Sequence, residues 1–390
     1  MPAVLLVASG ILLLFGIILY RRFVRAPRYQ SLLIRIGAVV GLVAMSAAIF
    51  VGFAYQNGNL VGRLPRLVGM LGMTWLAAAF YLLLGAGLSA IVALALRIAR
   101  RDRAAIIRWH RRSVPVIVVA SLAVTGYGVL EAGRLAVTES TVTIPGLPAQ
   151  LEGYRVAVIT DLHAGPVRGT DLVDRAVTLT NRSGPDAVLL VGDLTDGTTA
   201  QFGDVLTPLA DLAAPDGVYA VTGNHEYYAG DSAGWVNRWR TLGIEPLLND
   251  SATIERDGAR LRLAGVNDDA AIETAGTRDG LPAAELLPDL AAALAQVDPQ
   301  EPTILLAHRP GVAEDPLVRA AGVDLMVSGH THGGQIWPFT YLVKLANPTV
   351  SGLDSIDGTT AYTSRGAGTW GPPTRVLVPA EIPVLTLTAG

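Results

Sequence analysis

Long apolar runs, with few charges inside them, fill the first third of the chain, and arginines separate them. The runs cover residues 4–20, 36–55, 67–96 and 114–130. Each approaches or exceeds the ~20 residues that a helix needs to cross the hydrocarbon core of a bilayer, and the first and last are near the lower limit of ~17. We therefore predict a transmembrane region of four helices within residues 1–135.

Two other interpretations fit this pattern less well. A cleaved signal peptide would need a site of small residues before Arg21 and Arg22, and the sequence offers none. A buried helical domain of a soluble protein would not place blocks of arginine between uninterrupted apolar runs.

The arginines also predict an orientation. The first and third connecting loops carry twelve of them, whereas the second loop and the segment after the fourth run carry three. Loops rich in Arg and Lys stay in the cytoplasm. Both termini, and with them the C-terminal domain, are therefore expected outside the cytoplasm, on a multi-pass protein of the plasma membrane.

The pattern changes after residue 135. Residues 136–150 are predicted to form an extended linker, because Pro145 and Pro148 oppose a helix. From Leu151 onward, helical patterns such as 170–182 and 282–296 fall between short apolar runs. These runs read as buried strands and cover residues 156–160, 187–191, 218–221, 303–307 and 323–327. Such alternation predicts an α/β domain over residues 151–390.

Composition narrows the possible chemistry. The chain has no cysteine, so it has neither a disulfide framework nor a thiolate metal site. Its formal net charge of −3 gives no sign of a groove for nucleic acid, which is not expected as a partner.

Polar residues follow each of the five predicted strands. Because the carboxyl ends of strands in an α/β sheet converge on one crevice, these residues are expected to be neighbours in space. Five of the six histidines lie among them, while His110 is expected on a solvated surface. The residues at the strand ends are Asp161, His163, Asp193, Asp196, Asn224, His225, His308, His330 and His332.

Aspartate, asparagine and imidazole ligands without thiolate suit Mn²⁺, Fe²⁺, Zn²⁺ or a similar ion. The donors are too many for one ion. Two ions about 3.5–4 Å apart, bridged by a carboxylate and a water, would use them all and form a phosphoryl-transfer site. His330 and His332 stand one residue apart with Gly329 and Gly333 beside them, so we expect both at a strand end whose backbone lies close to the ions.

The motifs Asp161-Leu-His163, GDLTD (192–196), GNHE (223–226), a lone His308 and GHTH (329–332) occur in order. This series resembles the calcineurin-like metallophosphoesterase superfamily, over residues 142–390. TIPGLP (143–148) and GHTHGGQ (329–335) resemble its bacterial membrane-associated branch, and the four predicted spans resemble the transmembrane metallophosphoesterase-domain proteins of animals. The resemblance implies an α/β fold, a two-sheet αββα sandwich, after the transmembrane helices.

Roles for the polar residues follow from the resemblance. It implies that Asp161, His163 and His332 bind one divalent metal ion, that Asn224, His308 and His330 bind a second, and that Asp193 bridges the two. His225 would be catalytic, as a general acid or a ligand of the phosphate, with Asp196 orienting it.

The sequence therefore predicts a membrane-anchored phosphoesterase that hydrolyses a phosphate ester or phosphoanhydride by attack of a metal-bridging hydroxide. A phosphorylated lipid or envelope precursor is the expected substrate class, because Trp337, Phe339, Tyr341 and Leu342 follow the metal motif as an apolar lip. Two alternatives stay open at this point. One is a metal-binding sensor or regulatory domain of a membrane transporter, and the other is a nucleotide-directed phosphodiesterase.

Overall fold

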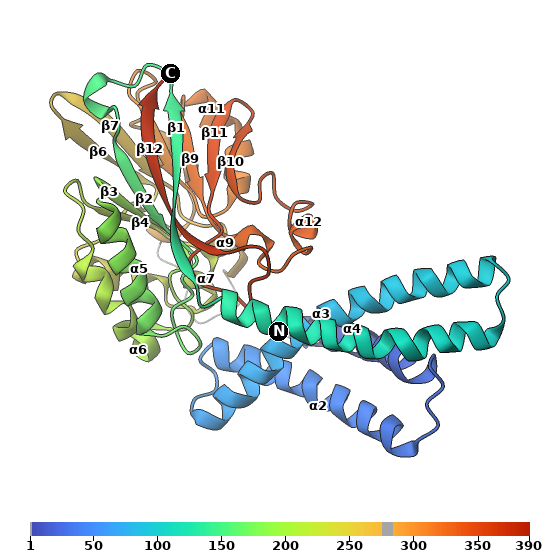
Figure 1. Cartoon of the computed structure of the whole chain (residues 1–390). Coiled ribbons are helices and arrows are strands. Elements are labelled where there is room, and N and C mark those ends of the chain that lie inside the picture. The colour runs from blue at the N-terminus through green and yellow to red at the C-terminus, as the bar shows by residue number, and fades with distance from the viewer. Residues whose placement is uncertain (1, 275–283) are drawn as a thin grey trace. The chain divides into compact units, whose positions relative to one another are not determined.

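Four long helices form the first of two compact units of the chain (Figure 1). The computed structural model describes residues 2–274 and 284–390. The helices are α1 (Pro2–Tyr20), α2 (Leu32–Gln56), α3 (Arg63–Ile98) and α4 (Arg103–Glu131). Each contains one of the predicted apolar runs, and all four are long and apolar enough to cross a membrane. A single π-helical turn, Arg21–Arg25, extends α1.

The fourth helix begins well before its apolar run. The arginine-rich residues from Arg103 onward, expected to form a loop, instead make the first turns of α4, which packs against α3. His110 consequently lies within the helix, 5% exposed, with Nδ1 3.5 Å from the Ser89 hydroxyl. The expectation of a solvated His110 was wrong, because the connection between the two helices is much shorter than the charge pattern suggested.

The second unit is built on two six-stranded mixed sheets. The first has the strand order β1 (Leu135–Ile144), β12 (Ala380–Ala389), β2 (Arg155–Ile159), β3 (Ala187–Val191), β4 (Val218–Val221), β5 (Glu245–Pro246). The second has the order β10 (Gly352–Ile356), β11 (Thr359–Thr363), β9 (Leu325–Ser328), β8 (Thr303–Leu306), β7 (Ala259–Gly265), β6 (Asp250–Arg256). Strands β2, β3 and β4 run parallel in the first sheet, and β7, β8 and β9 run parallel in the second.

Alternate residues of the central strands fill different layers of the core. Val156, Leu189 and Val327 meet between the sheets, whereas Ile159 and Leu190 pack on the outer helices of the first sheet. Strands that bury both faces read as continuous apolar runs, which is why the sequence predicted them. The helices of the unit are α5 (Thr170–Ser183), α6 (Thr199–Phe202), α7 (Asn224–Tyr228), α8 (Ser232–Thr241), α9 (Ala270–Thr274), α10 (Leu290–Leu294), α11 (Pro316–Ala320) and α12 (Thr340–Val343). The predicted αββα sandwich is confirmed.

Two local predictions differ from the structure. Most of the expected linker 136–150 belongs to β1, an edge strand paired along its whole length with β12, because polar side chains alternate with Val137 and other apolar ones. The helix expected over 282–296 is broken within its described part. Residues Ala284–Leu286 form a 3₁₀ turn, Pro288 interrupts the chain, and α10 starts only after its cap Asp289, while 282–283 lie outside the described residues.

Candidate metal centre

The predicted site residues do lie at the carboxyl ends of β2, β3, β4, β8 and β9, where the chain turns sharply. Five of them adopt positive φ angles of 46–69°, in the left-handed region that non-glycine residues rarely enter. Each such residue costs about 1–2 kcal/mol relative to a right-handed conformation. Strain of this kind clusters where the surrounding structure fixes side chains for a function. The five are Asp161, His163, Asp193, His330 and His332.

One group of donors consists of Asp161, His163 and His332, whose ligand atoms lie within 4.8 Å of one another. The Nε2 atoms of the two imidazoles are 3.1 Å apart, and His332 Nε2 lies 3.5 Å from a carboxylate oxygen of Asp161. All three side chains are buried.

A second group consists of Asp193, His308 and His330 within the same span. His308 directs Nδ1 at the carbonyl of Val191, 2.8 Å away, so its Nε2 is left for a ligand, 3.2 Å from Asp193. His330 Nδ1 lies 2.8 Å from the amide oxygen of Asn224. The two histidines of the GHTH motif thus join different donor groups, because a tight turn after β9 separates them.

Asp193 also lies in a third group, together with His163 and His225. Its carboxylate therefore stands between the two clusters. Its Oδ1 accepts the backbone N–H of His225 at 2.8 Å, which fixes it to the start of α7.

Asp196 orients two imidazoles with a single oxygen. Its Oδ1 lies 3.1 Å from Nδ1 of His163 and 2.7 Å from Nδ1 of His225. Both rings consequently keep Nε2 available. A carboxylate behind a histidine sets its tautomer and strengthens it as a ligand or base.

Several side chains of the cluster have pKa values that are shifted far from their usual range. Burial raises the pKa of Asp193, but the imidazoles of His308 and His225 outweigh burial and hold this pKa well below its usual range. Burial alone would lower the pKa of His225, yet Asp193 and Asp196 raise it to about 9. Burial and the charge of His308 lower the pKa of His330 to about 3, which keeps its imidazole neutral.

Glu226, in the GNHE motif, supports the backbone of the site. Its carboxylate accepts N–H groups of Gly223 at 2.8 Å, Asp193 at 3.1 Å and Leu194 at 2.9 Å. It therefore ties the turn after β4 to the turn after β3.

Gly223 and Gly329 allow a close approach that no side chain would permit. A Cβ at Gly223 would lie 2.4 Å from a carboxylate oxygen of Asp193, and one at Gly329 would lie 2.2 Å from the Thr160 hydroxyl. The motif glycines are thus required by packing around Asp161 and Asp193.

Two divalent metal ions fit this donor set. The buried carboxylates of Asp161 and Asp193 converge with the imidazoles. The buried Nε2 of His308 lies 3.2 Å from Asp193 but makes no hydrogen bond of good geometry to any described residue, so it can bind an ion. Oxygen and imidazole donors without sulfur suit ions such as Mn²⁺, Fe²⁺ or Zn²⁺.

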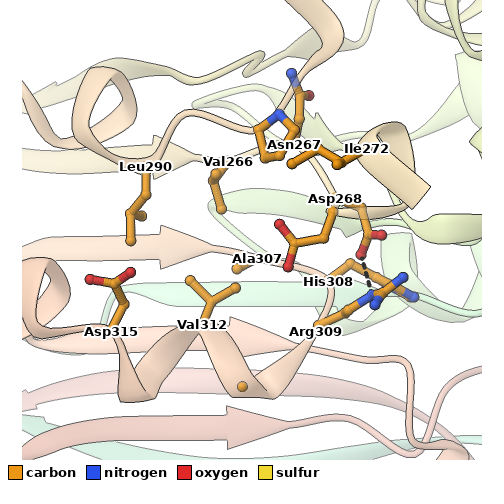
Figure 2. Close-up of a pocket in the computed structure, with 13 residues that line it drawn as sticks. Val266, Asn267, Asp268, Ile272, Leu290, Ala307, His308, Arg309, Val312 and Asp315 are labelled. Carbon is orange, nitrogen blue, oxygen red and sulfur yellow. Dashed lines mark hydrogen bonds and ion pairs between the residues drawn. The ribbon is translucent and has the colours of Figure 1, made fainter. Parts of the chain in front are cut away.

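Two features flank the centre. Trp370, 45% exposed, sets its ring edge-to-face to His225 with centroids 5.8 Å apart, and Gln335 hydrogen-bonds both backbone groups of Trp370. Beyond His308 lies a cavity of about 350 Å³ that also contains Asp268 and Arg309 (Figure 2).

Known proteins with similar sequences include metallophosphoesterases, in agreement with the metal-binding geometry. Residues 154–334 match the family model described as calcineurin-like phosphoesterase. A bovine (Bos taurus) relative, "Transmembrane protein with metallophosphoesterase domain", is 36% identical over 287 residues, which are 72% of this chain and 63% of the relative. An "Uncharacterized metallophosphoesterase" of Aquifex aeolicus is 32% identical over 263 residues, 67% of this chain and 95% of the relative.

A solved dimetal phosphatase from Danio rerio is similar at 15% identity and a TM-score of 0.39, over 61% of this chain and 100% of that one. The match to the bovine protein spans about 63% of that relative's length. Because the Aquifex relative is 32% identical over 95% of its length and the family model matches residues 154–334, the chain belongs to the calcineurin-like phosphoesterase family.

Proposed function

We propose that this chain is a membrane-anchored phosphoesterase that uses two divalent metal ions to hydrolyse a phosphate ester or phosphoanhydride. One observation carries the proposal. The buried Asp193 carboxylate belongs to donor groups on both sides of it, one through His163 and the other through His308 and His330. A carboxylate in this position could bind two ions, and pairs of ions held close together serve phosphoryl transfer.

The donor groups at the strand ends suggest which residues would bind each ion. Asp161, His163 and His332 would hold one ion, and Asn224, His308 and His330 would hold the other, with Asp193 between them. When bound, the ions supply positive charge for the phosphate oxygens and lower the pKa of water.

His225 would donate the proton that the leaving oxygen needs. Asp196, whose Oδ1 lies 2.7 Å from Nδ1 of His225, favours the protonated imidazole and leaves Nε2 for the substrate. With 9% of its surface exposed, it is accessible from outside the cluster.

A phosphorylated lipid or envelope precursor is the substrate class that we propose. Trp337, Phe339, Tyr341 and Leu342, which form the apolar lip, are 41–65% exposed in and around α12. An exposed apolar surface of this kind suits an acyl or isoprenyl chain. We also propose that the catalytic domain lies on the extracytoplasmic side of the plasma membrane, an orientation that the arginine distribution between the loops supports.

Hydrolysis by the full-length chain in detergent tests the proposal. The protein is stripped, reloaded with Mn²⁺, and given a chromogenic phosphodiester and the matching monoester. We expect turnover that disappears in Asp193→Asn and persists in Asp174→Asn, which changes an exposed aspartate of α5. Equal turnover in both variants would refute the proposed site, and metal binding without any turnover would favour a sensor.

A further inference from the structure

Arg168 is a cation without an anion. Its Nε and Nη2 both donate to the hydroxyl of Thr369, at 3.0 and 2.6 Å, and it makes no ion pair within residues 2–274 and 284–390. Burial, and to a smaller extent the nearby charge of Arg175, lower the pKa of this guanidinium to about 10. A partly buried cation loses part of its hydration, and a neutral hydroxyl compensates for this loss less than an anion would.

The other arginines beside the centre are neutralised. Arg309 lies 3.1 Å from Asp268 and 2.8 Å from Glu273. Arg365 forms an ion pair with the buried Glu381. In contrast to these two arginines, Arg168 has no carboxylate partner among the described residues.

Two contacts connect Arg168 to the reacting end of the site. Its partner Thr369 precedes Trp370, whose ring lies against His225. The loop that contains Arg168 also packs against the GDLTD motif. The carbonyl of Arg168 accepts the N–H of Gly165, and a Cβ at Gly165 would lie 2.7 Å from the carbonyl oxygen of Asp196. Part of the guanidinium side chain stays accessible to solvent.

We propose that Arg168 binds a second anionic group of the substrate, a phosphoryl group other than the one that reacts, and so selects substrates that carry two. The inference rests on the proposed function and adds a specificity-determining residue to it. The planar guanidinium matches phosphate oxygens with two parallel N–H donors. Thr369 holds Nε and Nη2 from one side, which leaves Nη1 without a partner among the described residues.

The cavity beside His308 is predominantly acidic. The cavity beyond His308 is lined by Asp268, Asp269 and Asp315, and its one arginine, Arg309, is already paired with Asp268 (Figure 2). A second phosphoryl group would be repelled there. The second phosphoryl group would therefore be favoured beside Arg168 and disfavoured in this cavity.

A ratio of two activities tests this role. The substrates are the p-nitrophenyl ester of glycerol phosphate and the same ester with a second phosphate on the glycerol, given to the Mn²⁺-loaded full chain. In Arg168→Gln, the ratio of kcat/KM for the bisphosphate to kcat/KM for the monophosphate should fall about 10- to 100-fold, because a charge-assisted contact is lost. Arg168→Lys should restore part of it, and Arg182→Gln, an exposed arginine of α5, should leave the ratio unchanged. A ratio unchanged in Arg168→Gln, or near one in the native protein, would overturn the proposal.

A binding measurement separates this inference from the proposed function. Methylenediphosphonate and methylphosphonate, which are not hydrolysed, are titrated into the metal-loaded chain. Arg168→Gln should raise the Kd of the diphosphonate about tenfold or more relative to that of the monophosphonate. If the native chain hydrolyses nothing, the proposed function fails and this titration still decides the role of Arg168, since an unchanged relative Kd excludes it.

The same assay distinguishes two sources of the second phosphoryl group. A long-chain alkyl diphosphate represents a lipid, and a nucleoside diphosphate ester represents a soluble metabolite. If Arg168→Gln lowers kcat/KM for the alkyl diphosphate more than Arg182→Gln does, the substrate is a lipid. If it lowers kcat/KM for the nucleoside diphosphate ester more than Arg182→Gln does, the substrate is a soluble metabolite. No excess loss on either would overturn the inference.

Discussion

The Nε2 atoms of His163 and His332 lie 3.1 Å apart, although the two residues are separated by 169 positions in the chain. Asp196 holds Nδ1 of His163, and Asp161 lies 3.5 Å from Nε2 of His332. The turns after β2, β3 and β9 thus bring two imidazole nitrogens close together beside the carboxylate of Asp161. This is the arrangement that one tetrahedral or octahedral ion requires from its protein ligands.

Loss of His332 should remove one ion and leave the other. We expect His332→Ala to lower the metal content of the loaded protein from two ions to about one per chain, because Asp193, His308 and His330 form a separate group. Elemental analysis after desalting measures the content, with Asp174→Asn as the control. Complete loss of metal, or none, would show that the two groups do not act as separate sites.

Asp196→Asn should impair catalysis more than metal content. The amide oxygen of an asparagine can still accept hydrogen bonds from His163 and His225, but it has no charge and therefore holds the two imidazoles less strongly than the carboxylate does. Residues that orient ligands in this way typically contribute about 10–100-fold to activity or affinity. We expect kcat to fall within that range on any substrate that the native protein hydrolyses. A kcat equal to that of Asp174→Asn would mean that Asp196 is dispensable.

Glu226→Gln should destabilise the fold around the centre. The carboxylate accepts three backbone N–H groups, and a glutamine would oppose at least one of them with its own N–H₂. A buried donor without an acceptor costs about 1–3 kcal/mol. For a domain of this size we expect the Tm of the metal-free protein to fall by about 2–10 °C. Glu255→Gln, on an exposed strand position, is the matched control, and an equal Tm in both variants would contradict the clamp.

The strands that carry the site were predictable because each buries both faces. A run such as Ala187–Val191 has no polar residue and ends directly at a motif, so the order of motifs along the chain gave the order of strand ends. The two-sheet architecture came from the resemblance of these motifs to a family. Local sequence carried both pieces of information.

Other features depend on partners that are distant in the chain. The strand β1 alternates polar and apolar residues beside two prolines, and only its pairing with β12, more than two hundred positions away, distinguishes it from a linker. Arg168 resembles any loop arginine in the sequence. Its significance comes from the absence of a carboxylate around it in the described structure, which no local pattern can reveal.

The apolar lip should matter only for substrates with a hydrocarbon chain. We expect the double variant Tyr341→Ser and Leu342→Ser to lose about tenfold in kcat/KM on a phospholipid in mixed micelles, since burying two such side chains contributes a few kcal/mol at most. Turnover of a short-chain phosphodiester provides the comparison. A Leu287→Ser variant, at an exposed apolar position outside the lip, controls for changes in solubility. Equal losses on both substrates would contradict contact between the lip and the lipid.

Stability should fall with rising pH through the titration of Asp324, a group remote from the metal ligands. Burial raises the pKa of its carboxyl above the usual value, although the N–H of Thr303, 2.9 Å from Oδ2, lowers it. Between the usual pKa of about 3.9 and the raised one, the folded state binds more protons than the unfolded state, so the free energy of unfolding decreases as pH rises. Asp324→Asn keeps an acceptor for Thr303 and removes this titration. The stability of the variant relative to the native protein should therefore increase from pH ~3.5 to pH ~6, by less than about 1 kcal/mol because the carboxyl is partly exposed. Thermal unfolding across this pH range measures the difference in stability between Asp324→Asn and the native protein. Asp324→Ala, which lacks the acceptor for Thr303, should be less stable than Asp324→Asn at every pH. A stability difference between Asp324→Asn and the native protein that is constant or decreases with rising pH would contradict the raised pKa.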